Sequence, residues 1–335
     1  MATRQADSPL PWGEFELIDK LFAPLARSLP GAFDLKDDVA VLAPRQGHEL
    51  VLKTDSVIEG VHFLPDDPAD TVAQKALRRA LSDLAAKGAE AQAYLLALAL
   101  PKTTEKSWLE KFAEGLSRDQ AEFGAALAGG ETDRTPGALT VTITAIGWVP
   151  EGRLLRRAGA RRADEVWVTG TIGDAAGGLH ILKDKVVLEN EAAHDHLVGR
   201  YLVPRPRLAF GMALRGIATA TIDVSDGLLA DLGHVAEVSQ ARIEINLDSV
   251  PLSSELRALW GKSPETVLHA ISAGDDYEIA FTSPAATADE IDAAARRTGT
   301  PATRIGRVAE GASEVALLDS SGREMSGQRR GYTHF

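Results

Sequence analysis

Short runs of strand-forming residues alternate with longer runs of helical periodicity along the whole chain of 335 residues. The strand-like runs are 49–53, 92–100, 139–149, 165–169, 219–223, 242–247 and 277–282. Apolar residues recur at helical spacing in 71–87, 105–123, 206–217, 228–239 and 288–297. This alternation is typical of layered α/β or α+β folds rather than of a helical bundle or a β-sandwich.

The length of the chain favours two domains, because 335 residues, 44% of them hydrophobic, exceed what one core usually organises. A polar stretch at 150–164, with one proline, two glycines and five arginines, follows a long apolar strand. We place the boundary there, which predicts domains at 1–150 and 151–335.

Composition restricts the classes of partner. A net charge of −12 argues against a bare nucleic-acid or anionic-membrane surface. The chain has no cysteine, which leaves no disulfide and no thiolate metal site. The longest apolar run, 94–100, is far shorter than the roughly 20 residues that span a bilayer, and the N-terminus carries no apolar signal segment. We therefore expect a soluble, cytoplasmic protein.

Acidic residues gather beside Gly, Ser and Thr, where strands are expected to give way to loops. The clusters are Asp37-Asp38, Thr54-Asp55, Ser82-Asp83, Gly129-Gly130-Glu131-Thr132, Asp223-Val224-Ser225-Asp226-Gly227 and Gly274-Asp275-Asp276-Tyr277-Glu278. Taken singly, each cluster is explained better by turn formation than by a functional role, and Ser225 or Asp226 would make a suitable N-cap for the helix that follows.

Asp83 is harder to explain as a turn residue, because it falls at the edge of the apolar stripe of the helix expected at 71–87. A half-buried carboxylate there needs a partner. If the acidic clusters converge, their mutual repulsion requires cations, and ligand sets made only of oxygen atoms select Mg²⁺, Mn²⁺ or Ca²⁺. Mg²⁺ typically binds a few carboxylates together with substrate phosphates, which points to a nucleoside triphosphate.

A glycine-rich turn follows the strand expected at 165–169, in the run Thr169-Gly170-Thr171-Ile172-Gly173-Asp174. It fits neither the P-loop pattern nor the dinucleotide-binding pattern. Contact with a phosphate and simple packing of a helix on a sheet are about equally compatible with it.

In order and spacing, these motifs resemble the thiamine-monophosphate kinase family, which belongs to a superfamily with aminoimidazole ribonucleotide synthetase. The most diagnostic segments are Glu59-Gly60-Val61-His62-Phe63, Leu81-Ser82-Asp83-Leu84, Asp223-Val224-Ser225-Asp226-Gly227 and Gly274-Asp275-Asp276-Tyr277-Glu278. The resemblance implies two α/β domains, of which the N-terminal one binds ATP with several Mg²⁺ ions and dimerises through its sheet.

The resemblance also implies roles for single residues. The implied metal ligands are Asp38, Thr54, Asp55, Asp83, Glu131, Asp223 and Asp226. ATP contacts are implied at Gly130, Glu131, Arg157 and Ser225, and contacts to thiamine monophosphate at His62, Asp275 and Tyr332. The chain departs from the commonest family pattern at Lys36, Lys53, Ala80, Glu131 and Asp275.

The reaction implied is transfer of the γ-phosphoryl group of ATP to thiamine monophosphate, giving ADP and thiamine diphosphate. A phosphate monoester has a second pKa near 6, so an unprotonated oxygen is available at neutral pH and no general base is required. His62 is therefore expected to bind substrate or to pack its loop. Two alternatives remain at this point: another ATP-dependent member of the superfamily, such as aminoimidazole ribonucleotide synthetase, and a non-catalytic protein that binds Mg-nucleotide.

Overall fold

The computed structural model describes residues 13–325, and the chain divides into two compact units. Unit 1 comprises the described residues up to Ala80 together with Ala91–Trp148, and unit 2 comprises Leu81–Glu90 and the residues from Val149 onward. The last turns of one helix therefore group with unit 2, although most of that helix belongs to unit 1. In residues 13–325, none of the helices combines the length and the apolar character needed to cross a bilayer.

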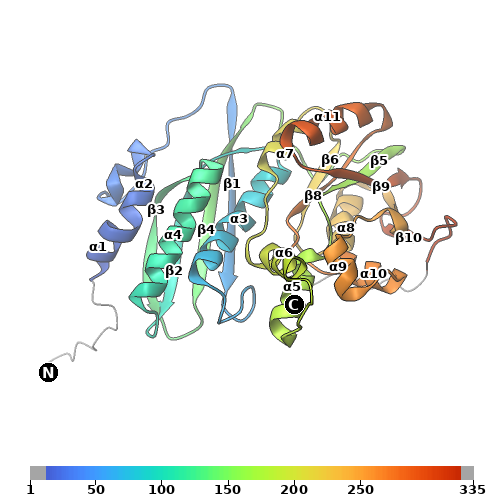
Figure 1. Cartoon of the computed structure of the whole chain (residues 1–335). Coiled ribbons are helices and arrows are strands. Elements are labelled where there is room, and N and C mark those ends of the chain that lie inside the picture. Colours follow the sequence, from blue (N-terminus) through green and yellow to red (C-terminus); the bar gives the residue numbers. More distant parts are fainter. Residues whose placement is uncertain (1–12, 326–335) are drawn as a thin grey trace. The chain divides into compact units, whose positions relative to one another are not determined.

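Unit 1 is built on a four-stranded sheet in the order β1-β4-β2-β3 (Figure 1). Its strands are β1 (His48–Ile58), β2 (Glu90–Pro101), β3 (Ala126–Thr135) and β4 (Thr140–Pro150). Its helices are α1 (Glu14–Leu17), α2 (Ala23–Ala26), α3 (Ala69–Ala86) and α4 (Lys106–Phe123), with a π-helical turn at Ile18–Phe22 and a 3₁₀ segment at Pro30–Leu35.

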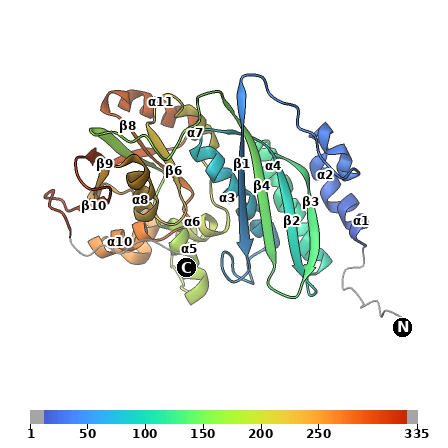
Figure 2. The same cartoon turned by 180° about the vertical axis from the view of Figure 1, so that it is seen from behind.

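The two faces of this sheet differ. Helices α3 and α4 cover one face, onto which β4 directs the buried side chains of Val141, Ile143 and Ala145. Figure 2 shows the opposite face in front, with β1 and β4 uncovered in this view. Alternation along β1 directs Leu50 and Leu52 to that side, and their exposed fractions are 49% and 62%. One face of unit 1 thus presents exposed leucine side chains.

Unit 2 contains a six-stranded sheet in the order β10-β7-β9-β5-β8-β6. Its strands are β5 (Asp164–Thr169), β6 (Ala220–Val224), β7 (Arg242–Asn246), β8 (Glu278–Pro284), β9 (Ala302–Ala309) and β10 (Val315–Leu318). Its helices are α5 (Asp174–Asp184), α6 (Glu191–Leu202), α7 (Leu208–Ala213), α8 (Leu228–Ser239), α9 (Ser254–Trp260), α10 (Pro264–Ser272) and α11 (Ala288–Thr298), with short 3₁₀ turns at Leu247–Ser249 and Ala285–Thr287. Except for β10 with β7, neighbouring strands run antiparallel.

The core of unit 2 lies on both faces of its sheet. On one face, Val166 and Ile222 pack with Leu232 of α8 in a large apolar cluster. On the other, Trp167 stacks on Phe281 at 6.3 Å between ring centroids, and Phe281 in turn contacts Phe210 of α7. The neighbouring strands β6 and β8 are antiparallel, with Val224 opposite Glu278. The end of β6 therefore lies beside the start of β8.

Every predicted strand and helix is present, but three strands and six helices of the described residues lie outside the predicted runs. These elements are β3, β9, β10, α1, α2, α5, α6, α9 and α10. Helices α6, α9 and α10 each begin at a polar N-cap: Asn190, Ser253 and Ser263 accept backbone N–H groups from the first turn. These capping residues were the available sequence signal.

The predicted end of the first strand was wrong, because β1 continues through Thr54 and Asp55 to Ile58. Polar cross-strand pairs explain the extension: the Thr54 and Thr144 hydroxyls lie 2.9 Å apart, and those of Ser56 and Thr142 lie 2.8 Å apart. Such pairs stabilise a strand whose sequence looks like a loop.

Candidate functional site

Two acidic motifs of unit 2 meet where β6 ends and β8 begins. The backbone N–H of Asp275 donates to the carbonyl oxygen of Ser225 at 2.9 Å, and that of Tyr277 donates to Val224 at 2.8 Å. Gly274 is required at this contact, because a Cβ there would lie 2.3 Å from the carbonyl oxygen of Ser225. The fold therefore joins the segments 223–227 and 274–278, which are about fifty residues apart in the sequence.

The acidic motif Ser82-Asp83, near the end of α3, contacts the motif of β6. The hydroxyl of Ser82 donates to Oδ2 of the buried Asp223 at 3.0 Å. Asp83, the next residue on α3, is half-buried, as its position at the edge of the apolar stripe predicted. Lys87 Nζ donates to the carbonyl oxygen of Thr221 at 3.0 Å and ties the end of the helix to β6. Ser82, Asp223 and the β8 motif thus belong to one site within unit 2, and Asp83 is the neighbour of Ser82 in the chain.

The loop after β6 is held by a residue that the sequence analysis missed. Asp231, buried in the first turn of α8, accepts the N–H groups of Ser225 at 2.9 Å and of Asp226 at 3.1 Å. The expected N-cap was wrong: the cap position is Gly227, with φ at 111° and no side-chain hydrogen bond. Ser225 and Asp226 are therefore not used to cap the helix. An aspartate inside an apolar helical run was the signal for Asp231.

Negative charge is concentrated around this loop. Burial, together with the neighbouring carboxylates of Asp223 and Asp226, raises the pKa of Asp231 to about 8. Both neighbouring carboxylates disfavour the ionisation of Asp231.

In unit 1, a cavity of about 790 Å³ opens beside β3, the strand that carries the predicted ATP contacts Gly130 and Glu131. Its polar lining includes Asp37, Asp38, Gly129, Gly130, Glu131 and Thr132, and its apolar lining includes Phe22, Leu95, Leu127 and Ile146. The predicted residues Asp38, Gly130 and Glu131 thus line one hollow. Asp37, from the same acidic pair, lies with them and had not been given a role.

Gly130 is fixed by packing. It lies opposite Leu96 in the parallel pair β2–β3, and a Cβ at this position would lie 1.8 Å from the carbonyl oxygen of Leu96. Glu131 is the next residue of β3, and its Oε1 accepts a hydrogen bond from the backbone N–H of Thr132 at 3.0 Å. The cluster expected in a loop therefore lies in a strand, and the strand keeps its backbone exposed at Gly130.

Thr54 and Asp55 lie on opposite sides of the sheet, because they are consecutive residues of β1. The Asp55 carboxylate pairs with Lys53 Nζ at 3.3 Å, whereas the Thr54 hydroxyl pairs with Thr144. One ion bound by both residues would use the Thr54 backbone carbonyl rather than its hydroxyl. Lys53, a departure from the common family pattern, places a resident cation beside Asp55.

His62 sits in the tight turn that follows β1. Its Nδ1 accepts the backbone N–H of Ile58 at 3.1 Å. In the neutral ring, Nδ1 is then the acceptor and Nε2 carries the proton. His62 in this tautomer can donate a hydrogen bond from Nε2 and cannot accept a proton there. Its geometry agrees with a binding or packing role.

Two predicted contact residues remain. Arg157 is an exposed residue of the segment between β4 and β5, where its carbonyl oxygen accepts a hydrogen bond from Ser239. Tyr332 lies outside the described residues, so its predicted contact with thiamine monophosphate stays a prediction.

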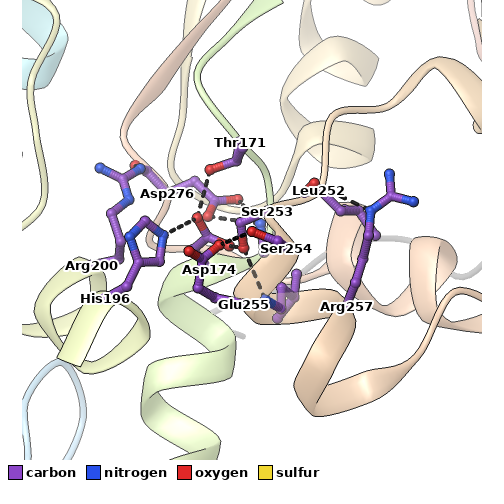
Figure 3. Close-up of polar contacts among 12 residues, drawn as sticks. Thr171, Asp174, His196, Arg200, Leu252, Ser253, Ser254, Glu255, Arg257 and Asp276 are labelled. Atoms are coloured by element: carbon purple, nitrogen blue, oxygen red, sulfur yellow. Dashed lines mark hydrogen bonds and ion pairs between the residues drawn. The ribbon is translucent and has the colours of Figure 1, made fainter. Parts of the chain in front are cut away.

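The glycine-rich turn after β5 is a packed turn. The N–H of Gly173 donates to the carboxylate of the buried Asp276 at 2.9 Å, and a Cβ on Gly173 would lie 2.6 Å from that of Ala270. Figure 3 shows the next residue, Asp174, beside His196 and Ser253. Their side chains bond Asp174 at 3.0 and 2.6 Å. The sequence left open whether this turn contacts a phosphate or only packs a helix on the sheet. In the structure, the N–H of Gly173 is bonded to a protein carboxylate, which favours packing.

The donor set suits a hard divalent cation, because the predicted ligands are carboxylates and hydroxyls without sulfur. They divide between the units, with Asp38, Thr54, Asp55 and Glu131 in unit 1 and Asp83, Asp223 and Asp226 in unit 2. Within residues 13–325, no three His, Asp or Glu side chains are arranged as a ready metal site.

The fold and the sites define the class of protein. Residues 36–149 match the family model for the N-terminal domain of AIR synthase related proteins, and residues 162–319 match the model for their C-terminal domain. Together the two matches cover most of the chain, and they confirm the predicted fold of two α/β domains of this type.

Individual relatives narrow the class. The chain is 40% identical to the thiamine-monophosphate kinase of Caulobacter vibrioides over 98% of this chain and 93% of that protein. Among solved structures, it resembles the thiamine-monophosphate kinase of Stenotrophomonas maltophilia with a TM-score of 0.79 and 40% identity, over 84% of this chain and 89% of that one. AaThiL complexed with AMPPCP and TMP gives a TM-score of 0.75 and 31% identity, over 96% and 97% of the two chains. The chain belongs to the thiamine-monophosphate kinase family, as its motifs predicted.

Proposed function

We propose that this protein phosphorylates thiamine monophosphate with ATP, giving thiamine diphosphate and ADP. The observation that carries the proposal is the site of unit 2, where hydrogen bonds connect three of the four most diagnostic segments of the family, those at 81–84, 223–227 and 274–278. The relative AaThiL, which is similar over 96% of this chain, was solved with AMPPCP, an ATP analogue, and TMP.

The nucleotide is proposed to use the cavity of unit 1. A nucleoside triphosphate needs an apolar surface for its base and a cationic or N–H-rich environment for its phosphates. The cavity has apolar side chains such as Phe22 and Leu127, the exposed backbone of Gly130, and the carboxylates of Asp38 and Glu131. Carboxylates bind a triphosphate only through cations, so this lining implies a metal–nucleotide complex.

We assign several Mg²⁺ ions to the predicted ligands Asp38, Thr54, Asp55, Asp83, Glu131, Asp223 and Asp226. When bound, the metal would offset the negative charge of the phosphates and of the phosphoryl group during its transfer. The protein contributes fixed oxygen ligands, held by hydrogen bonds such as the one from Ser82 to Asp223. Arg157 and Ser225 are proposed to contact ATP.

The acceptor needs no general base, because the phosphate of thiamine monophosphate presents an unprotonated oxygen near neutral pH. The tautomer of His62 agrees with this chemistry, since Nε2–H can donate to a phosphate oxygen or to another acceptor of the substrate. His62, Asp275 and Tyr332 are proposed substrate contacts. The protein therefore acts by positioning both phosphates for in-line transfer.

A homodimer formed through the sheet of unit 1 is proposed as the working assembly. The exposed leucines of β1 lie on the face opposite α3 and α4, beside the hydroxyl pairs that link β1 with β4. An apolar face of this kind is typical of an interface between subunits. The location in the cytoplasm remains a prediction from the sequence.

The experiment that tests the function compares acceptors in parallel. The purified protein is given ATP and Mg²⁺ with thiamine, thiamine monophosphate or formylglycinamidine ribotide, and ADP release is measured. We expect ADP release only with thiamine monophosphate. Release with formylglycinamidine ribotide would favour aminoimidazole ribonucleotide synthetase activity, and nucleotide binding without turnover of any acceptor would favour a nucleotide sensor.

A further inference from the structure

The segment Asp275–Tyr277 holds an unusual backbone conformation. Asp275 has φ at 71° and Tyr277 has φ at 52°, both in the left-handed region that side chains other than glycine disfavour. Such strain persists only where the surrounding structure imposes it, and it is concentrated at functional sites. The segment also contains Asp275, a proposed substrate contact.

Buried contacts fix the middle of the segment. The carbonyl oxygen of Asp276 accepts a hydrogen bond from Nη2 of Arg200 at 3.0 Å, and its carboxylate accepts the N–H of Gly173. Figure 3 shows Arg200 directed at Asp276 from the neighbouring helix α6. The same guanidinium donates to Glu278 at 2.8 Å, so Arg200 bridges the two residues on either side of Tyr277.

The side chain of Tyr277 holds the side chain of Asp275 in place. Its side chain is only 2% exposed, and its hydroxyl donates to Oδ1 of the half-buried Asp275 at 2.8 Å. A buried phenol has little rotational freedom, so the hydrogen bond restricts the direction of the carboxylate.

We propose that Tyr277 is a positioning residue that fixes the Asp275 carboxylate for the thiamine moiety of the substrate. The inference rests on the proposed function. Thiamine carries a cationic thiazolium ring, and an oriented carboxylate is suited to such a cation. ATP has no cationic ring, so the contribution of the pair Tyr277–Asp275 is specific to the acceptor.

The test uses steady-state kinetics of Tyr277→Phe, Asp275→Asn and the double variant, with ATP and thiamine monophosphate varied in turn. We expect Tyr277→Phe to raise the KM for thiamine monophosphate about tenfold, the size that loss of one hydrogen bond to a charged group produces, with kcat and the KM for ATP unchanged. In the Asp275→Asn background, the further change to Phe is expected to have no effect on KM.

A matched control is Tyr94→Phe, which removes the hydroxyl of another buried tyrosine, bonded to Gln120 in unit 1 at 3.0 Å. This control is expected to leave both KM values unchanged.

A wild-type KM for thiamine monophosphate in Tyr277→Phe, or effects on this KM that multiply in the double variant, would overturn the proposal. If Tyr277→Phe does not fold, Asp275→Asn still decides, because an unchanged KM for thiamine monophosphate there removes the role of the pair. A wild-type protein that fails to turn over thiamine monophosphate would instead overturn the proposed function, and this inference with it.

Discussion

Ser82 and Asp223 are 141 residues apart in the sequence and are joined by a hydrogen bond of 3.0 Å. Ser82 lies near the end of α3, and Asp223 lies in β6 next to the loop that carries Ser225 and Asp226. The contact is largely buried, because the exposed fractions of the two residues are 1% and 3%. It links two acidic motifs that were recognised separately in the sequence.

Replacing Ser82 by alanine is expected to destabilise unit 2. The change removes one donor from a buried carboxylate, which typically costs about 1–2 kcal/mol. Urea unfolding followed by circular dichroism measures the free energy of unfolding. Ser254→Ala is the control, since Ser254 is exposed and is expected to change stability by less than about 0.5 kcal/mol. Equal stabilities for the two variants would argue against a structural role for the bond.

Asp83→Asn and Asp223→Asn are expected to lower kcat by about a hundredfold or more, because each removes a charge that is proposed to hold the metal–nucleotide complex. The melting temperature of Asp83→Asn should stay within about 3 °C of the wild type, since the residue is only half-buried. Asp292→Asn, at an exposed position of α11, is the control and should keep full activity. Wild-type turnover in Asp83→Asn would contradict its assignment as a ligand.

Glu278 is expected to make the protein sensitive to acid. Burial raises its pKa, but the guanidinium groups of Arg207 and Arg200 more than offset this effect and lower the pKa below its ordinary value. A carboxylate with a lowered pKa stabilises the fold fully above its unfolded pKa of about 4.3, and this stability is lost as the pH falls through the folded value.

Glu278→Gln should therefore cost about 3–5 kcal/mol at pH 7, because two largely buried arginines lose their counter-charge. The difference from wild type should shrink as the pH falls below the unfolded value of about 4.3 and through the lowered folded pKa, where Glu278 becomes protonated in the wild type as well. Thermal melts across pH measure this difference. Glu310→Gln removes an exposed ion pair with Arg162 and should have little effect at any pH. A penalty for Glu278→Gln that is independent of pH would contradict the ion-pair explanation.

Leu52→Glu is expected to convert a dimer to a monomer in size-exclusion chromatography with light scattering, because it places a charge on the exposed leucine face of β1. Val238→Glu makes the same change at a residue of α8 that is 50% exposed, and it should leave the assembly unchanged. A wild-type protein that is already monomeric, or a Leu52→Glu variant that stays dimeric, would rule out this interface.

The layered fold could be predicted because the apolar periodicity of the long elements agrees with their packing. The stripe on α3 placed Asp83 correctly at the boundary of the core. By contrast, β3 was missed because Gly129 and Gly130 lower strand propensity, and the requirement for Gly130 comes from Leu96 on the neighbouring strand. A close approach between two strands is a tertiary constraint that local sequence does not carry.

The acidic motifs could be recognised, but not their internal organisation. Asp231 can accept the N–H groups of Ser225 and Asp226 only because the first turn of α8 faces the loop. The opposite directions of Thr54 and Asp55 follow from the extension of β1, which depends on hydroxyl partners in β4. Side-chain roles taken from motifs therefore depend on local geometry that only the folded chain defines.

Transfer of the terminal phosphoryl group of ATP to thiamine monophosphate is tested most directly with ATP labelled at the γ-phosphate. With Mg²⁺ and equimolar acceptor, the label is expected to appear in thiamine diphosphate, at its terminal phosphate, in one-to-one ratio with the ADP formed. Label recovered only as inorganic phosphate, or no thiamine diphosphate despite bound nucleotide, would contradict the assignment.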